Sequence, residues 1–459
     1  MESVQILDLY ACVLSGIKLG MQNESDVPAA TFQALFQKLL PCDVIEEAVK
    51  SSGLLRRCPP TVSSVQLIQC LAYHVLAESG TLADHVKQMT GVEIGDSAIS
   101  QRRAKMPVSL FDQLMAAALK PKGDAKLHPE AFHKGLRVCG LDGSTFSVAN
   151  TPQVKRQMRK AKSRRGRAAF PKVGVVVMVE LGLRNPLAAA LGAGGESEMV
   201  LARKVLAHQP AQSLLVVDRY YGFGELLVGW SEEGGRHFLA RVKTGLKRRV
   251  VESYADGSAL VEVRSGKKTR LVREIMGRVS RGGRGPAKVV RLWTSLLDWA
   301  AHPAKEMLAL YARRWEQEIF YKELKVDTRS TPLLQSHTPL TAMQEIAAMI
   351  LGYAVLVDYR MEAAKAGEVG VLRISFLKTL HAVQGLWRFL EVSADLLTPE
   401  GVDLVVQRIL AQLADMVTPK RRQRSCPRAL RQPVSSWPRL RKNTYNDGEI
   451  DYSIKKIIE

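Results

Sequence analysis

The chain lacks the cysteine patterns that mark a disulfide or zinc framework. Its 459 residues include six cysteines, none of them in a C-x-x-C pair, and no histidine pair stands at zinc-finger spacing. Scattered single cysteines argue against a structural zinc site and against a disulfide-stapled secreted domain. We therefore expect a cytoplasmic protein with reduced thiols at Cys12, Cys42, Cys58, Cys70, Cys139 and Cys426.

Long hydrophobic runs are also lacking. The longest aliphatic run, VGVVVMV from Val173, falls far short of the ~20 residues that a membrane-spanning helix needs. The first residues, MESVQILDLYACVLSG, start with an acid and have neither a basic segment nor a small-residue cleavage site. The sequence therefore predicts no membrane span and no signal peptide.

Acidic residues are scarce relative to basic ones. Lys and Arg number 66 against 45 Asp and Glu, which gives a net charge of +21 and a pI of about 9.8. Hydrophobic residues make up 46%, which is ordinary for a soluble globular protein, and the length suits roughly two to four domains. The excess of positive charge favours binding to a polyanion, most simply nucleic acid.

Residues 1–125 are predicted to be helical and to bind DNA. GTLADHVKQMTG reads as a short helix with Thr81 as its N-cap, and IGDSAISQRRAKM as a second one capped by Asp96. Two short helices with a glycine-containing link suggest a helix-turn-helix over about residues 80–106. The alternative is an ordinary helical hairpin with a basic outer face. The DNA-reading side chains would be Ser100, Gln101, Arg102 and Arg103.

From about residue 130 the pattern changes to strands that alternate with helices. LRVCGLDGSTFSV and QSLLVVDRYYG read as apolar strands that run to Asp142 and Asp218. Such alternation predicts an α/β fold for residues 130–335. Within this region, residues 244–300 read as antiparallel hairpins. Residues 336–459 are predicted to form a helical region followed by a basic, proline-interrupted tail.

The stretch YARRWEQEIFYKELK predicts one helix that continues through Lys325. At about 100° per residue, four of its side chains fall within an arc about 60° wide and about 21 Å long. The face is either a solvated charged surface or one wall of a site that handles a metal and a polyanion. The four side chains stand at offsets of 0, 3, 7 and 14 residues and are Tyr311, Arg314, Glu318 and Lys325.

Three carboxylates are candidates for metal chemistry. Asp142 and Asp218 end apolar strands, where the polar groups of α/β folds gather, and Glu318 lies on the helix. A carboxylate so near the core is costly unless a cation compensates it. Together they could hold two Mg²⁺ ions about 3.5–4 Å apart for an in-line phosphoryl displacement. Arg314 and Lys325 would then grip the flanking phosphates.

These segments resemble the DDE transposases of bacterial insertion sequences, of the insertion-sequence 4 type. LDGSTF resembles the family's first-aspartate motif and places that acid at Asp142. VVDRYYGFGELL resembles the second motif and places the second acid at Asp218, beside Arg219, with Tyr220 where many members have glycine. The family's Y-(2)-R-(3)-E-(6)-K signature is matched without a gap by Tyr311, Arg314, Glu318 and Lys325.

The resemblance implies a ribonuclease-H-like core, interrupted by a β-rich insertion and flanked by helical regions. It implies that Asp142, Asp218 and Glu318 are the catalytic and metal-binding residues, with two Mg²⁺ ions that Mn²⁺ can replace. The implied reaction nicks double-stranded DNA at the transposon ends and joins the 3′-OH to target DNA. The implied assembly is a homodimer on DNA at the bacterial nucleoid. Trp293 is a candidate to stack on a flipped base, although a core position is the preferred interpretation.

The stretch VKRQMRKAKSRRGRAAFPK contains nine Lys and Arg residues and no acid. One interpretation is a solvated loop. Its position just after the first aspartate favours a clamp on the phosphates of end DNA. The predicted DNA-binding residues of this stretch are Lys155, Arg156, Arg159, Lys160, Arg164 and Arg165.

Two rival functions stay open at this level. One is a non-catalytic or domesticated sequence-specific DNA-binding protein, which the charge and the helix-turn-helix would suit. The other is a ribonuclease-H-like nuclease that cuts DNA without joining it. Three acids near a polyphosphate argue against the first, and the family signature argues against the second.

Overall fold

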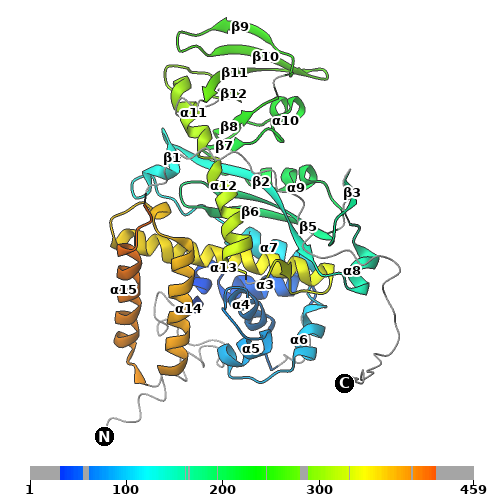
Figure 1. The fold of residues 1–459 in the computed structure, drawn as a ribbon, viewed down its shortest axis with the longest axis vertical. Coiled ribbons are helices and arrows are strands. Elements are labelled where there is room, and N and C mark those ends of the chain that lie inside the picture. The colour runs from blue at the N-terminus through cyan, green and yellow to red at the C-terminus, as the bar shows by residue number, and fades with distance from the viewer. Residues whose placement is uncertain are drawn as a thin grey trace, which may run out of the picture. The chain divides into compact units, whose positions relative to one another are not determined.

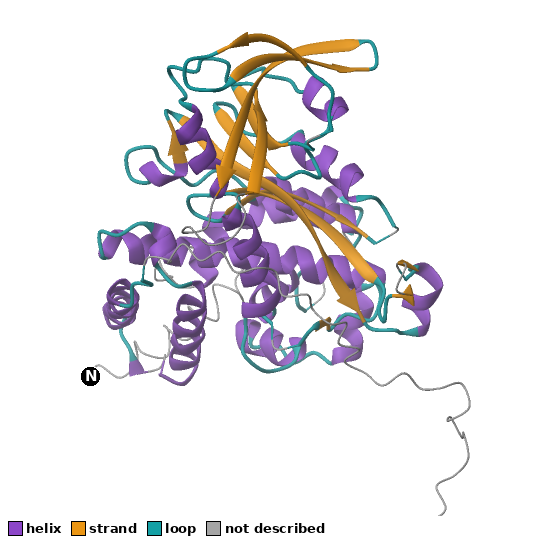
Figure 2. Cartoon of the chain, turned by 45° about the horizontal axis from the view of Figure 1, so that its top comes forward, coloured by secondary structure: helices purple, strands orange, loops and turns teal. Residues whose placement is uncertain are grey.

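A mixed β-sheet is the centre of the fold (Figure 2). The computed structural model describes residues 32–54, 61–160, 162–163, 166–193, 195–243, 245–279, 288–329, 331–393 and 396–419. Along the sheet, the described strands follow the order β6 (Asn185–Gly192), β5 (Lys172–Glu180), β2 (Leu136–Val148), β7 (Ser213–Val217), β8 (Arg236–Arg241), β12 (Lys288–Thr294), β11 (Lys268–Val279), β10 (Ala259–Ser265) and β9 (Arg249–Ser253). Short strands β1 (Phe132–His133) and β13 (Leu333–Leu334) pair with β2, and β3 (Lys162–Ser163) pairs with β4 (Gly166–Arg167).

Helices precede, interrupt and follow the strands (Figure 1). The first group is α2 (Phe32–Leu39), α3 (Cys42–Ser51), α4 (Ser64–His74), α5 (Leu82–Thr90), α6 (Asp96–Arg103) and α7 (Val108–Ala118). Between and after the strands come η1 (Pro129–Ala131), α8 (Pro152–Gln157), α9 (Glu198–Leu206), α10 (Gly224–Val228), α11 (Ala304–Ala312), α12 (Trp315–Lys322) and the π-helical η2 (Glu323–Asp327). The last group is α13 (Pro339–Ala366), η3 (Val371–Arg373), α14 (Phe376–Ser393) and α15 (Pro399–Asp415).

The strand directions give the core its class. Strands β6, β5 and β2 pair antiparallel, whereas β2, β7 and β8 pair parallel. Helices α9 and α10 lie in the connections that lead into β7 and β8, as parallel neighbours require. The predicted α/β class and ribonuclease-H-like core are therefore confirmed.

Strand β5 explains how both faces of the sheet are covered. Val175 and Val177 pack in an apolar cluster with the amino-terminal helices and α13, whereas Val176 and Met178 pack with α9. Side chains alternate between the two faces of a strand. An uninterrupted apolar run therefore forms a strand that is buried on both sides.

The insertion between the second aspartate and the helix continues the core sheet. Strand β12 pairs antiparallel with β8, where Leu292 faces Arg241 and Trp293 faces Ala240. Trp293 is 1% exposed, and its Nε1 donates to Glu274 Oε2 at 2.9 Å. Trp293 is therefore a core residue, as preferred from the sequence, and its ring has no exposed face on which a base could stack.

Helix α13 lies at the centre of the helical layer. It has 28 residues and is apolar and long enough to cross a membrane, but 83% of its most apolar window is buried inside the fold. Its side chains share one apolar cluster with helices α2–α7 and with α14. The described residues all belong to one compact unit. The predicted domain boundaries near residues 125–130 and 335–336 stay predictions. Residues on both sides of each boundary contribute to the same apolar core.

The two short helices predicted around residues 80–106 are present as α5 and α6. Thr81 caps α5, and it shares a reciprocal capping box with Asp84. Helix α6 differs from the prediction, because Gly95 is its N-cap and Asp96 is its first residue. An aspartate in the first turn still interacts favourably with the positive end of the helix dipole.

The prediction of one regular helix through Lys325 is wrong. The amide of Arg314 donates to the carbonyl of Tyr311, three residues back, so the chain tightens between α11 and α12. After Lys322 it widens into the π-helical η2. Tight and wide turns rotate the side chains in opposite senses relative to an α-helix. The angles expected for an ideal helix therefore do not apply over this stretch.

Candidate active site

Two aspartates lie side by side at the carboxyl end of β7. Strands β2 and β7 are parallel, and Leu141 pairs with Val217. The next residue along each strand is Asp142 on β2 and Asp218 after β7. Neighbouring strands are about 4.8 Å apart, so the sheet brings together two carboxylates that are far apart in the sequence.

Asp142 is in an environment that disfavours its charge. Burial raises its pKa to about 7, and the charges of Asp218 and Glu198 add to the increase, while the Gly143 amide and Arg314 oppose it. Its Oδ1 accepts a hydrogen bond from the Gly143 amide at 2.9 Å. Burial is thus the main reason that the charged form of Asp142 is disfavoured, and a bound cation would favour that charged form.

Arg314 lies between the carboxylates of Asp142 on β2 and Glu318 on α12. Its Nη2 donates to Glu318 Oε1 at 2.6 Å, and its Nη1 lies 3.9 Å from Asp142 Oδ2. These side chains are 17%, 28% and 22% exposed, so the cluster is reachable from solvent. Helix α12 thereby places the third predicted carboxylate opposite the strand that carries the first.

Tyr311 and Lys325 lie on the same side as Arg314, despite the break in the helix. Tyr311 is near Asp218 and Arg314, and burial raises the pKa of its hydroxyl. Lys325 donates from Nζ to Ser144 Oγ at 3.1 Å. Ser144 is two residues beyond Asp142, so both point to one face of β2. All four signature residues therefore face the two strands that carry the aspartates.

Tyr321 was not identified from the sequence, yet it ties α12 to the aspartate strand. Its hydroxyl donates to the Asp142 carbonyl at 2.7 Å and accepts from the Val177 amide at 3.1 Å. Beside it, Gln317 Nε2 donates to the Val177 carbonyl at 3.1 Å. Tyrosine and glutamine on a helix are too common for their spacing alone to reveal this role.

Glu198 was also missed, and it is a fourth carboxylate at this place. It lies in the first turn of α9, and its Oε1 accepts from the Tyr221 hydroxyl at 2.6 Å. An acid in a first helical turn is ordinary, so the sequence carries no sign of this position. Only the fold reveals that Glu198 lies near the aspartates, because it brings α9 against Gly143 of β2.

The opposite face of α12 carries a second set of charges. Arg184 binds Glu316 through Nε at 2.7 Å and Glu323 through Nη1 at 2.5 Å. Tyr353 of α13 donates to the other oxygen of Glu323 at 2.6 Å. Arg184 and Glu323 are each 6% exposed, so this cluster holds α12 to the β5–β6 turn and to α13.

The predicted DNA-reading residues of α6 differ from each other. Arg102 is half-buried, and no bond from its guanidinium to a described residue is found. Arg103 donates to Gln344, Ser336 and the Thr341 carbonyl at 3.1–3.3 Å. Arg103 therefore joins α6 to the start of α13, which leaves its guanidinium poorly placed to reach a base.

The basic segment after β2 has a partly exposed, anchored start. Val154 and Met158 are buried, and the cations Lys155, Arg156 and Arg159 point to solvent. Lys160 donates to the Ala169 carbonyl at 2.8 Å. The remaining predicted contacts of this segment, Arg164 and Arg165, lie outside the described residues.

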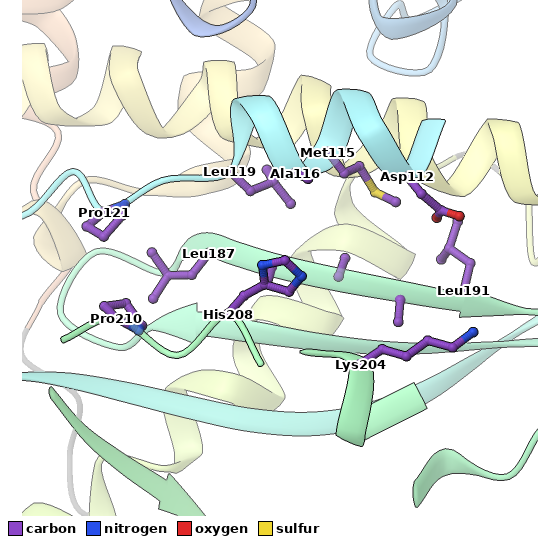
Figure 3. A pocket seen from close by; sticks show the side chains of 13 residues that line it. Asp112, Met115, Ala116, Leu119, Pro121, Leu187, Leu191, Lys204, His208 and Pro210 are labelled. Carbon is purple, nitrogen blue, oxygen red and sulfur yellow. The ribbon is translucent and has the colours of Figure 1, made fainter. Parts of the chain in front are cut away.

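Two pockets have different relations to this site. One open pocket adjoins Asp218 and is lined by Arg219, Tyr220, Phe223, Met199 and Lys243. The other lies between α7, the edge strand β6 and the end of α9 (Figure 3). Its lining is mostly aliphatic, with Asp112, Lys204 and His208 at its rim, and it contains none of the predicted site residues.

The donor set suits a hard divalent cation. Among the residues that the structure describes, no three metal-ligating side chains lie together at metal-binding spacing. Arg314 stands between Asp142 and Glu318 and supplies the positive charge there. Carboxylate oxygens are the ligands that Mg²⁺ prefers, and such an ion would favour the charged form of the buried Asp142 carboxyl.

Comparison with known proteins decides the family. The family model described as a transposase DDE domain matches residues 133–353, which include every element of the site. The chain contains a transposase DDE domain. Transposase InsG of insertion sequence element IS4 from Escherichia coli (strain K12) is 28% identical over 75% of this transposase and 78% of its own length. The putative transposase InsZ of the same strain is 25% identical over 48% of this chain and 74% of its own.

One solved structure is more distantly similar to this transposase. It is a cryo-EM structure of the piggyBac transposase synaptic complex with hairpin DNA, with a TM-score of 0.44 and 10% identity. The similarity covers 86% of this transposase and 87% of that chain. At this level of similarity no residue role is carried across.

Proposed function

We propose that this transposase cleaves double-stranded DNA at the ends of an insertion sequence and joins the freed 3′-OH to target DNA. The observation that carries the proposal is the register of β2 and β7, which sets Asp142 beside Asp218 with Glu318 opposite. These three carboxylates would hold two Mg²⁺ ions, which Mn²⁺ can replace. Ions held there would supply activation of the attacking hydroxyl and stabilisation of the leaving oxygen.

The cations of the site have separate tasks in this proposal. Arg314 balances Asp142 and Glu318 and, through its planar fork, binds a phosphate next to the scissile one. Lys325 binds the strand farther on as a point charge, since its ammonium lies over β2 at Ser144. Tyr311 packs beside the strand being cut, and Arg219 contacts its backbone from the open pocket next to Asp218.

Further DNA contacts come from two surfaces outside the acid cluster. The exposed cations of the basic segment, Lys155, Arg156 and Arg159, contact phosphates of the end DNA, with Lys160, Arg164 and Arg165 beside them. Helix α6 reads the end sequence, with Arg102 as its contact and Arg103 as its anchor to α13. We further infer a homodimer on DNA and a cytoplasmic, nucleoid-associated location.

A joining assay tests the proposal against its rivals. Purified full-length protein is incubated with Mg²⁺, a labelled duplex that ends in the element's terminal repeat, and a plasmid. Transfer of the label to the plasmid supports the transposase reaction. Cleavage without transfer would favour a nuclease, and binding with neither would favour a DNA-binding protein. Asp142→Asn and Asp218→Asn should each stop cleavage while binding persists, and a variant that still cuts would remove its residue from the proposed metal site.

A further inference from the structure

We propose that Glu198 is a fourth metal-ligating carboxylate of this site. The inference rests on the proposed function, because it adds a ligand to the same metal centre. It concerns a residue that lies outside the three acids of the DDE motif and on a different helix from Glu318. Three observations carry it: a glycine that makes room for the carboxylate, a tyrosine that orients it, and the lack of a neutralising cation among the residues that the structure describes.

The room for Glu198 comes from Gly143, the residue after the first aspartate. A Cβ on Gly143 would lie 2.3 Å from Cδ of Glu198 and 2.6 Å from its Oε1. Real Cβ atoms do not approach other atoms so closely, so any side chain here would displace the carboxylate. Gly143 has no positive φ that would require glycine. The glycine therefore lets Glu198 approach the backbone of β2 closely, at the residue that follows Asp142.

The orientation of Glu198 comes from Tyr221. Its ring is 0% exposed and packs in the core with α9, and its hydroxyl donates to Glu198 Oε1 at 2.6 Å. A bond from a buried tyrosine fixes the carboxylate while the second oxygen is left to bind elsewhere. Metal-ligating carboxylates are commonly held by an outer hydrogen bond of this kind.

Within the described part of the chain, the carboxylate of Glu198 has few partners. Among the described residues, the only hydrogen bond found to its carboxylate comes from Tyr221, and no Lys or Arg pairs with it. After burial and the charge of Asp218, the charge of Glu198 also contributes to the raised pKa of Asp142. Two such carboxylates at one strand are mutually repulsive, and a divalent cation between them would remove that cost.

The ordinary role of a first-turn glutamate does not explain this arrangement. Glu225, in the first turn of α10, illustrates that role: it is exposed and pairs with Arg203 at 3.1 Å. Interaction with the helix dipole would be equally favourable if Glu198 pointed to solvent in the same way. Instead, Glu198 lies against Gly143 and beneath Tyr221.

Mn²⁺ binding to the full-length protein, without DNA, tests the inference. Glu198→Gln keeps the size of the side chain and an oxygen that can accept from Tyr221, so the fold should be preserved. We expect it to weaken Mn²⁺ affinity, followed by calorimetry or electron paramagnetic resonance, by about 10- to 100-fold. The melting temperature in EDTA should not fall, and Glu225→Gln, the matched control, should bind Mn²⁺ as the wild type does.

Gly143→Ala and Tyr221→Phe provide independent variants. The added methyl should displace Glu198 and weaken Mn²⁺ binding about as much as Glu198→Gln, whereas loss of the tyrosine hydroxyl should weaken it less. Wild-type affinity in Glu198→Gln, together with lost affinity in Asp142→Asn, would overturn the role of Glu198 and leave the proposed function intact. If the wild type itself bound no Mn²⁺, the metal-dependent function would fall as well.

Discussion

Helix α12 carries two charge clusters on opposite faces. They differ in their exposure to solvent and in how fully their charges are paired. On one face, Arg314 lies between Asp142 and Glu318, with all three side chains 17–28% exposed. On the other, Arg184 is 6% exposed and binds both Glu316 and Glu323. Both clusters consist of arginines and carboxylates. The residue types are the same, and only their burial and their neighbours differ.

This difference indicates which of the two clusters can take part in a reaction. A largely buried cluster whose charges are paired is rigid, because the loss of one partner leaves an unpaired charge in the interior. In a partly exposed cluster, the carboxylates can bind a metal ion and the guanidinium can bind a phosphate. We therefore assign stability to the Arg184 cluster and chemistry to the Arg314 cluster, and each prediction below tests that division.

The largest expected effect is on cleavage by Glu318→Gln. A bound metal contributes several kcal/mol to the transition state, so the loss of one ligand should lower cleavage by about 10³-fold or more. The rate of end cleavage measures it. Glu316→Gln, two residues earlier on the same helix, should cut within about tenfold of wild type. Equal losses in the two variants would erase the distinction between the faces.

Arg184→Met should have the largest effect on stability. It leaves Glu316 and Glu323 without their cation, which should reduce the free energy of unfolding by about 3–5 kcal/mol. Unfolding in urea measures the loss. Combining it with Glu316→Gln and Glu323→Gln should restore much of the stability, because the charges that caused the penalty are gone. A full loss in the triple variant would point to packing instead.

Asp142→Asn should stabilise the metal-free protein at neutral and higher pH. The pKa of Asp142 is raised from 3.8 to about 7, so its favourable contribution is complete below pH 3.8 and is lost as the pH rises through about 7. The variant should match wild type near pH 4 and gain about 2–4 kcal/mol by pH 8. Melting temperatures in EDTA across this range measure it. If the variant were no more stable than wild type at pH 8, the surroundings of Asp142 would not disfavour its charged form.

The contrast between bonded and free cations recurs on α6. Arg103→Ala should lower stability by about 1–3 kcal/mol, because Gln344, Ser336 and the Thr341 carbonyl lose their donor. Arg102→Ala should leave the melting temperature unchanged and reduce the preference for end DNA over random DNA by about 1 kcal/mol. Thermal melts and competition binding measure both. The reverse outcome would make Arg103 the reader.

The smallest effects are expected from conservative changes among the cations that face the two aspartate strands. Arg314→Lys should lower cleavage about tenfold, since one ammonium cannot replace a fork that reaches both Glu318 and Asp142. Lys325→Arg should stay within about threefold, and Lys325→Ala should reduce the salt slope of DNA binding by about one unit. Cleavage rates and binding at several salt concentrations measure these effects. A fully active Arg314→Lys with an inactive Lys325→Arg would reverse the two roles.

The fold and the acids were largely predictable from the sequence, and several neighbours of the acids were not. The strands that run to Asp142 and Asp218 follow from local apolar patterns. Tyr321 and Glu198 each reach the site from an element whose own sequence looks ordinary. Arg103 shows the converse, because a basic residue on a short helix reads as a DNA contact until its partners on α13 are known.

The sequence by itself determined the order of the elements and the identity of the signature residues, since both depend on neighbours along the chain. The tertiary structure alone decided that β12 joins β8, that the helix before Lys325 tightens and then widens, and that Arg184 takes one face of α12 while Arg314 takes the other. These outcomes depend on which distant segments meet. A side chain's burial and partners are set by packing, and packing is a property of the whole fold.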